Sequence, residues 1–162
     1  MITQERLKQL LNYDPETGIF ERNRWVGRRG KVHGIRKLGT QHEGYIRIRL
    51  DGVKYMAHRL AWLYVYGEFP EKQIDHINHD KSDNRICNLR EATQIENSQN
   101  KIRATRLNKL GVLGVSQVYG GKFKATITIN KERKVLGYGF TAQEAHELYL
   151  SAKRLHHEFC TI

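Results

Sequence analysis

The chain has 162 residues, room for one ordinary domain or two small ones, and 39% of them are hydrophobic, which is too many for a disordered chain. Lys and Arg outnumber Asp and Glu by 28 to 17, so the net charge of +11 makes a polyanion such as nucleic acid the expected partner. The longest apolar run covers residues 60–66 and the N-terminus lacks a secretion signal, so we expect neither a membrane span nor export.

The first forty residues predict a short helix, a turn and a basic loop. Thr3 can cap a helix that runs to about Leu11, and the sequence of residues 14–18 is typical of a turn. Seven basic residues and no acid lie between Arg22 and Lys37, which predicts an exposed loop that either follows DNA phosphates or is simply solvated. The candidate phosphate contacts in this loop are Arg22, Arg24, Arg28, Arg29 and Lys31.

The next forty residues predict a hairpin and a buried helix. Residues 45–50 alternate between apolar and cationic side chains, which is typical of a strand and adds Arg47 and Arg49 to the candidate DNA contacts. Asp51 and Gly52 form a hairpin turn, and a buried helix is expected from Ala57 to Tyr66, ended by Gly67.

The middle of the chain carries the residue types of a hydrolytic site. Asp75 and His76 lie on a short strand, a polar loop leads to Asn88 on a second strand, and a capped helix follows with Asn97 in its first turns. Oxygen ligands suit a hard divalent cation, and an imidazole can take a proton from an attacking water. Each residue alone is equally compatible with surface hydrogen bonding or turn formation.

The last third of the chain predicts a second small domain. Residues 101–162 hold 11 basic and 4 acidic side chains, and a basic linker is expected at 101–110. Strands are expected at 112–118, 122–130 and 134–138, followed by a helix whose capping box joins Thr141 to Glu144. The helix would cover the apolar face of the sheet and leave a polar, cationic face open. The chain is therefore predicted to be α+β, with a second domain at 111–162.

Residues 5–100 contain a set of linked motifs. These are Tyr55-x-Ala57-His58-Arg59-Leu60-Ala61-Trp62, Gly67-x-x-Pro70, Ile74-Asp-His-Ile-Asn78, Asp83-Asn-Arg-Ile86, Asn88-Leu-Arg90 and Glu96-Asn97-x-x-Asn100. The combination resembles the phage-type HNH homing endonucleases, which carry Asn in place of the last His. This resemblance implies an HNH domain at 1–100 with a ββα-metal (His-Me finger) core at about 73–101.

The resemblance implies a role for each matching residue. His76 would be the general base, Asp75 and Asn97 would bind one Mg²⁺ or Mn²⁺, and Asn88 would hold the loop and orient the base. The implied reaction is hydrolysis of double-stranded DNA, by a monomer or a homodimer, in a phage or mobile element and so in the host cytoplasm. With only Cys87 and Cys160 in the chain, no structural zinc is expected, and the thiols favour a reducing compartment.

The last third also has a resemblance, carried by Gly111-Val-x-Gly-Val115-Ser116, Gly121-Lys-Phe-x-Ala125-x-Ile127, Leu136-Gly137 and Phe140-Thr-x-x-Glu144-Ala145. It is similar to the Apetala, or ethylene-response-factor, DNA-binding domain, in which the open sheet face enters the major groove. The matching sheet positions are Ser116, Lys122, Lys124, Thr126, Thr128 and Lys134. The Trp and Arg that relatives carry on the first two strands are replaced here, which favours phosphate anchoring over base readout. A purely stabilising role for this domain stays open.

Two further expectations concern the site and its rivals. Neighbouring residues of a regular strand point to opposite faces, so the strand should bend or end at Asp75 and His76. We expect His58 to be a hydrogen-bonded structural residue. The alternatives to a nuclease are a DNA-binding regulator that does not cut and a basic RNA-binding protein. The latter is disfavoured because exposed aromatic residues for stacking are few.

Overall fold

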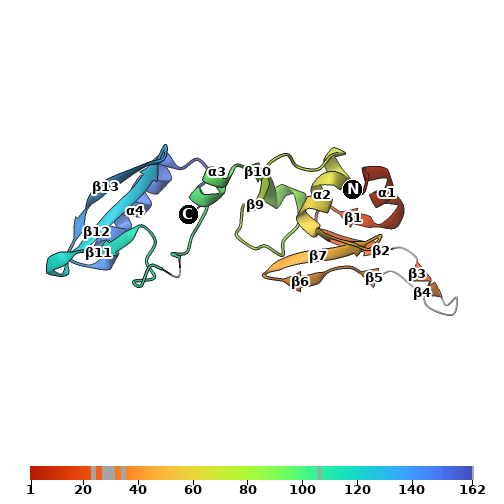
Figure 1. Cartoon of the computed structure of the whole chain (residues 1–162), viewed down its shortest axis with the longest axis horizontal. Helices are drawn as coiled ribbons and strands as arrows, with labels where there is room; N and C mark the ends of the chain where they lie inside the picture. The colour runs from red at the N-terminus through yellow and green to blue at the C-terminus, as the bar shows by residue number, and fades with distance from the viewer. Residues whose placement is uncertain (23–24, 27–31, 34–35, 106, 162) are drawn as a thin grey trace. The chain divides into compact units, whose positions relative to one another are not determined.

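The computed structural model describes residues 1–22, 25–26, 32–33, 36–105 and 107–161, with the backbone alone for 25–26, 32–33 and 36. The chain is α+β, with small antiparallel sheets, and divides into two compact units, Met1–Thr93 and Gln94–Ile162 (Figure 1). The sequence becomes more basic from residue 101, but this point does not coincide with the boundary between the units, because residues 94–100 already belong to the second unit.

The first unit combines helices with short antiparallel strands. Its helical segments are α1 (Gln4–Leu10), α2 (Ala57–Tyr66) and the 3-10 helix η1 (Ile86–Asn88). Its strands are β1 (Asn12–Asp14), β2 (Ile19–Arg22), β3 (Trp25–Val26), β4 (Val32–His33), β5 (Arg36–Lys37), β6 (Thr40–His42), β7 (Tyr45–Leu50), β8 (Val53–Met56), β9 (Gln73–His76) and β10 (Leu89–Ala92). They pair as β1-β2-β5, β3-β4, β6-β7-β8 and β9-β10.

Local signals account for the helices and the hairpin of this unit. Thr3 Oγ1 accepts a hydrogen bond from the backbone N–H of Arg6 at 3.2 Å, which confirms the predicted cap of α1. Helix α2 ends at Gly67, whose φ of 89° lies in the left-handed region that glycine adopts without strain. The hairpin between β7 and β8 turns at residues 51–52, as predicted.

The basic stretch from Arg22 to Lys37 is only partly a loop. Arg22 ends β2, pairs with Arg36 of β5 and is half-buried, and β3 pairs with β4, so the prediction of one exposed loop is wrong. Aromatic and β-branched residues at 25–26 and 32–33 favour strands. Four candidate DNA contacts, Arg24, Arg28, Arg29 and Lys31, lie outside the described residues.

The core of the first unit joins α1, α2 and strand β7. Leu7 of α1, Leu60 of α2 and Leu50 of β7 are each at most 1% exposed, and Phe20 packs beside them. Full burial of such side chains contributes roughly 2 kcal/mol each. This core fixes α2 and β7, the two elements that supply the surroundings of His76.

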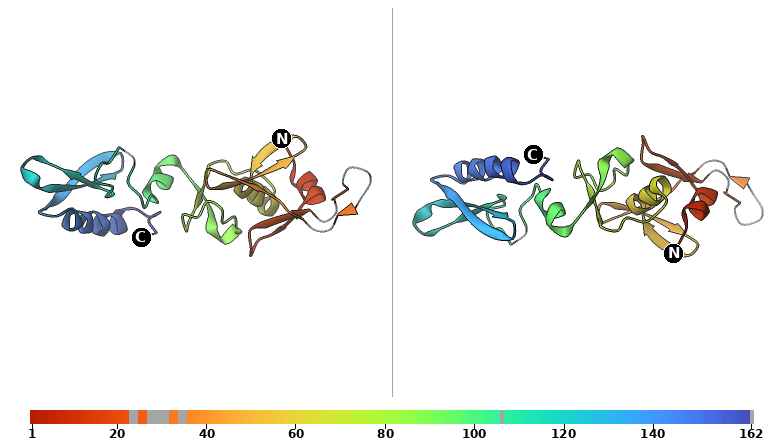
Figure 2. Two further views of the ribbon diagram at one scale, coloured as in Figure 1. Left: turned by 90° about the horizontal axis from the view of Figure 1, so that it is seen from below. Right: turned by 90° about the horizontal axis from the view of Figure 1, so that it is seen from above.

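The second unit is a three-stranded antiparallel sheet with helices. Its elements are α3 (Gln94–Gln99), β11 (Val115–Gln117), the 3-10 segment η2 (Tyr119–Gly121), β12 (Phe123–Ile129), β13 (Glu132–Gly139) and α4 (Ala142–His156). Helix α4 lies against one face of the sheet in both views of Figure 2, and Ala145 of α4 packs on Val115 and Ala125. The predicted arrangement of three strands and a capped covering helix is confirmed.

Candidate active site

Strands β9 and β10 place the two neighbouring candidate residues on opposite faces. Asp75 lies opposite Arg90 in the antiparallel register, and His76 lies opposite Leu89. Strand β9 ends at His76, as expected, and the chain turns at once, since the N–H of His79 donates to the carbonyl of His76 at 3.0 Å. Asp75 and His76 are therefore the last two residues of the strand, and both are buried.

The carboxylate of Asp75 is buried and charge-paired. Its side chain is 6% exposed, and its Oδ2 accepts hydrogen bonds from Arg90 Nε at 2.9 Å and Arg90 Nη2 at 2.8 Å. Charge-assisted pairing of this kind fixes the rotamer of the carboxylate and offsets the free energy of its desolvation. The role of Arg90 was not foreseen from the sequence, although its place in the second strand of the motif is a usable signal.

The imidazole of His76 is buried within a group of rings that we call the histidine cluster: Tyr45, His58 and His76. The His58 and His76 rings meet edge to face with centroids 5.1 Å apart, and the Tyr45 ring lies 5.4 Å from His58 and 5.8 Å from His76. The three residues come from β7, α2 and β9. The Lys81 ammonium lies over the Tyr45 ring, 4.6 Å from its centroid.

Both imidazoles of the histidine cluster favour the neutral form. Burial lowers the pKa of His76, and the nearby charge of Asp75 offsets part of that effect. Burial also lowers the pKa of His58 to about 3, with further lowering by His76 and Arg59. The His58 imidazole makes no hydrogen bond with the described residues, so the prediction of a hydrogen-bonded role is wrong: the ring is held by packing. A neutral His76 at physiological pH can accept a proton.

The loop between the two strands is held by side-chain amides. Asn88 Oδ1 accepts from the N–H of Asn78 at 2.9 Å, and Asn88 Nδ2 donates to the carbonyl of Asp83 at 3.0 Å. Hydrogen bonds from Arg85 lower the pKa of Asp83 to about 2. Asn88 is 6% exposed, so the loop next to His76 is anchored from inside.

The donor set suits a hard cation better than a soft one. Asp75 and Asn97 offer carboxylate and amide oxygens, and Mg²⁺ commonly takes only one or two ligands from protein. Within the described residues, no group of three or more His, Cys, Asp or Glu is placed to hold a metal ion, but a site with one carboxylate and one amide needs no such group. Asn97 lies half-buried on α3, in the second unit, whereas Asp75, His76 and Asn88 lie together in the first.

Candidate DNA contacts on β7 are partly engaged within the protein. Arg47 is half-buried, and the exposed Arg49 donates from Nε to the carbonyl of Gly52 at 3.2 Å.

The register of the second sheet sorts the remaining candidate DNA contacts. Ser116 of β11 and Lys124 and Thr128 of β12 lie on the face away from α4. Lys122 immediately precedes β12, and its ammonium lies 5.4 Å from the centroid of the Phe140 ring. Lys134 pairs with the buried Ile127, so it lies on the helix-covered side, and its expected place on the open face is wrong. The reason is a bulge at residues 125–126 of the pairing, which shifts the alternation of β13.

Val135, Arg133 and Tyr138 of β13 also lie on the open face, where the sequence had not placed them. Arg133 pairs with Thr128 and donates from Nη2 to Thr126 Oγ1 at 3.1 Å, while Tyr138 pairs with Lys124 and is 59% exposed. Thr126 is only 8% exposed, so its hydroxyl holds Arg133 rather than facing solvent, contrary to expectation. We call Ser116, Lys124, Thr128, Arg133, Val135 and Tyr138 the open sheet face.

Comparison with known proteins concerns the same part of the chain as the candidate site. Residues 55–99 match the family model described as HNH endonuclease. This range includes α2, the β9–β10 pair and α3. Residues 55–99 are therefore similar to HNH endonucleases. It is also 35% identical over 115 residues, 69% of this chain, to an uncharacterized HNH endonuclease of Acanthamoeba polyphaga mimivirus.

That alignment spans 59% of the viral relative's length, so it reaches only part of the longer protein. No solved structure matches the chain. Across the described residues, no helix combines the length and the apolar character needed to cross a membrane.

Proposed function

We propose that the protein is a metal-dependent DNA endonuclease of the HNH type, in which His76 is the general base. The observation that carries the proposal is a buried imidazole at the end of β9, adjacent in sequence to a carboxylate paired with Arg90, inside the matched family segment. Burial keeps the base unprotonated at neutral pH, and ring packing holds its orientation.

In the proposed reaction, His76 removes a proton from water as the water oxygen attacks the phosphorus of a phosphodiester. The bond to the 3′ oxygen breaks, that oxygen is protonated, and the products carry 3′-hydroxyl and 5′-phosphate ends. Asp75 and Asn97 would hold one Mg²⁺ or Mn²⁺, which supplies neutralisation of charge on the phosphate. Arg90 keeps the Asp75 carboxylate in place, and Asn88 keeps the loop beside His76 closed.

For the second unit we propose an Apetala-type, DNA-holding role through the open sheet face. Support comes from its exposed or half-exposed cationic groups Lys124 and Arg133, together with Lys122 at its edge. Arg133 adds a guanidinium that can bind a guanine edge through two hydrogen bonds, so base readout becomes part of the proposal. A monomer would nick one strand, and a homodimer would cut both.

The test is cleavage of supercoiled plasmid with Mg²⁺, with and without EDTA, by the wild-type protein, His76→Ala and the control His42→Ala, whose parent residue is exposed. We expect His76→Ala to lose about 10²–10⁴-fold in cutting rate, the usual contribution of a general base, while its DNA affinity in a gel shift stays unchanged. Equal cutting by His76→Ala and the wild type would reject the assignment.

A non-cleaving DNA-binding regulator is the second candidate, because the open sheet face does not depend on the site. It predicts DNA retention that is unchanged by EDTA and no cut products. Sequencing of the ends of any cut DNA separates HNH chemistry, which leaves a 5′-phosphate, from a contaminating nuclease that leaves a 3′-phosphate.

A further inference from the structure

A buried lysine of the second unit holds the chain just after α3. Lys153, near the end of α4, is 1% exposed, and its Nζ donates to the carbonyl of Lys101 at 2.6 Å. Burial lowers the pKa of this ammonium, and its desolvation opposes folding. An unbranched apolar side chain such as Met would fill the same space without the cost of burying a charge. The hydrogen bond is therefore what Lys153 provides and an apolar residue would not.

A second hydrogen bond reaches the same segment from the end of the described chain. Thr161 Oγ1 donates to Asn100 Oδ1 at 2.7 Å, and Asn100 is 2% exposed. Both bonds reach residues within four positions of Asn97. The segment that follows α3 is therefore held by polar contacts with residues that are distant in sequence.

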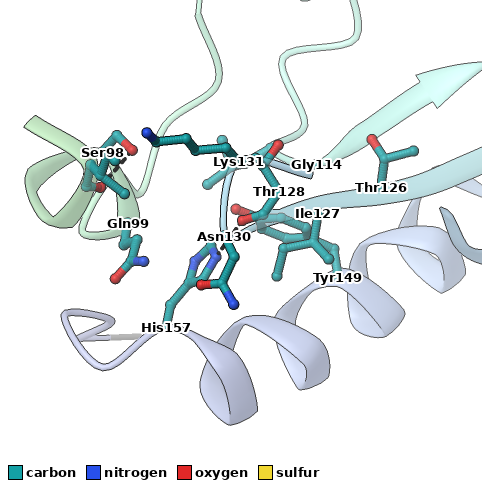
Figure 3. A pocket seen from close by; sticks show the side chains of 12 residues that line it. Ser98, Gln99, Gly114, Thr126, Ile127, Thr128, Asn130, Lys131, Tyr149 and His157 are labelled. Atoms are coloured by element: carbon teal, nitrogen blue, oxygen red, sulfur yellow. Dashed lines mark hydrogen bonds between the residues drawn. The ribbon is translucent and has the colours of Figure 1, made fainter. Parts of the chain in front are cut away.

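Helix α3 has little apolar packing of its own. None of its six residues is buried, and Ile95 is 51% exposed. Its Ser98 and Gln99 line a cavity of about 730 Å³ together with Asn130 and Lys131 of the β12–β13 turn. Figure 3 shows these side chains around the cavity. A helix this short is marginal in isolation, so its order depends on tertiary contacts such as those at residues 100 and 101.

We propose that Lys153 is a positioning residue for Asn97: by holding the Lys101 carbonyl it orders α3, the helix that carries Asn97. The inference rests on the proposed function, because it gives Asn97 the role of a metal ligand. It assigns the second unit a task besides DNA holding. An ordered α3 has less conformational freedom to lose when the ion binds, so metal affinity is higher.

The test uses the full chain without DNA and two readouts. Mn²⁺ affinity is measured by calorimetry, and hydrogen–deuterium exchange is followed at residues 94–101. The variants are Lys153→Met, which keeps an unbranched stem, Thr161→Val, which removes the exposed second donor, and Asn97→Ala. The control is Lys54→Met, which removes one positive charge from an exposed site in the first unit.

We expect Lys153→Met to accelerate exchange at 94–101 and to weaken Mn²⁺ binding about tenfold, which corresponds to ~1.4 kcal/mol, the size of one hydrogen bond. Thr161→Val should act in the same direction with a smaller effect, and Lys54→Met should match the wild type. Thermal unfolding of each variant checks that it is folded. If Lys153→Met does not fold, the test is made with Thr161→Val alone.

The outcomes separate this inference from the proposed function. Loss of Mn²⁺ binding in Asn97→Ala, with wild-type affinity and exchange in Lys153→Met and Thr161→Val, overturns the positioning role and leaves the nuclease assignment intact. Wild-type Mn²⁺ affinity in Asn97→Ala overturns both the ligand role and the inference that depends on it. Faster exchange together with weaker Mn²⁺ binding in both Lys153→Met and Thr161→Val supports the inference.

Discussion

Replacement of His58 by Phe should make the first unit less sensitive to acid. His58 titrates near pH 6.5 in an unfolded chain, whereas burial in the histidine cluster lowers its folded pKa to about 3. Below pH 6.5 the unfolded state therefore binds a proton that the folded state excludes, so the free energy of unfolding falls as the pH falls. Phe keeps an aromatic ring beside His76 and does not titrate.

The size of the effect follows from the two pKa values. Each pH unit between them removes up to ~1.4 kcal/mol from the free energy of unfolding, so lowering the pH from about 6.5 to 4.5 should remove roughly 2–3 kcal/mol through His58. At 7% exposure, His58 is only slightly screened by solvent. Carboxylates with lowered pKa, such as Asp83, keep their contribution in this window and lose it only below about pH 4.

The assay is urea unfolding followed by tryptophan fluorescence at pH 6.5, 5.5 and 4.5, with linear extrapolation to zero denaturant. Trp62 lies on α2, the helix that carries His58, and reports on the same unit. We expect the pH dependence of His58→Phe to be flatter than that of the wild type, while the exposed-site control His42→Phe follows the wild type. Identical pH slopes in His58→Phe and the wild type would refute the reasoning that burial excludes a proton from His58.

Three further changes test the contacts that support the site and the second unit. Arg90→Met should lower the free energy of unfolding by about 3 kcal/mol in urea denaturation, because it leaves the buried Asp75 carboxylate without the Arg90 donors; a change under about 1 kcal/mol would contradict the pairing. Asn88→Ala should lower it by roughly 1–3 kcal/mol, since two backbone groups of the loop lose their side-chain partner; an unchanged melting temperature would argue against the anchor. Gly114→Ala should destabilise the second unit, because the new Cβ would lie 2.1 Å from a ring carbon of Tyr149 at a φ of +76°; wild-type exchange protection in β12 would disprove that close packing.

Sequence patterns predicted the regular elements where the signal is local. Thr3 caps α1, Gly67 ends α2 and Thr141 caps α4, each through contacts within a few residues along the chain. The turn at 51–52 and the strand order β11-β12-β13 were also predictable, because hairpin connections bring sequential strands together. The motif around Asp75 and His76 further pointed to the HNH class that the family match supports.

Contacts between distant residues could not be predicted in the same way. The pairing of Arg90 with Asp75 depends on the register of β9 and β10, and a shift by one residue would send one side chain to the opposite face. A bulge in the second sheet moved Lys134 off the open face and Arg133 onto it. Sequence alternation alone cannot locate a bulge, because the extra residue changes the face of every position after it.

The amino-acid sequence by itself determined which chemical groups this protein has to work with: a carboxylate, an imidazole and amides in a basic chain, with the caps and turns that start and end its elements. Only the tertiary structure decided the surroundings of those groups. Burial among Tyr45 and His58 keeps His76 neutral, and the Arg90 guanidinium compensates the charge of Asp75. Desolvation and charge pairing arise from neighbours brought close by packing, and so they are properties of the fold rather than of local sequence.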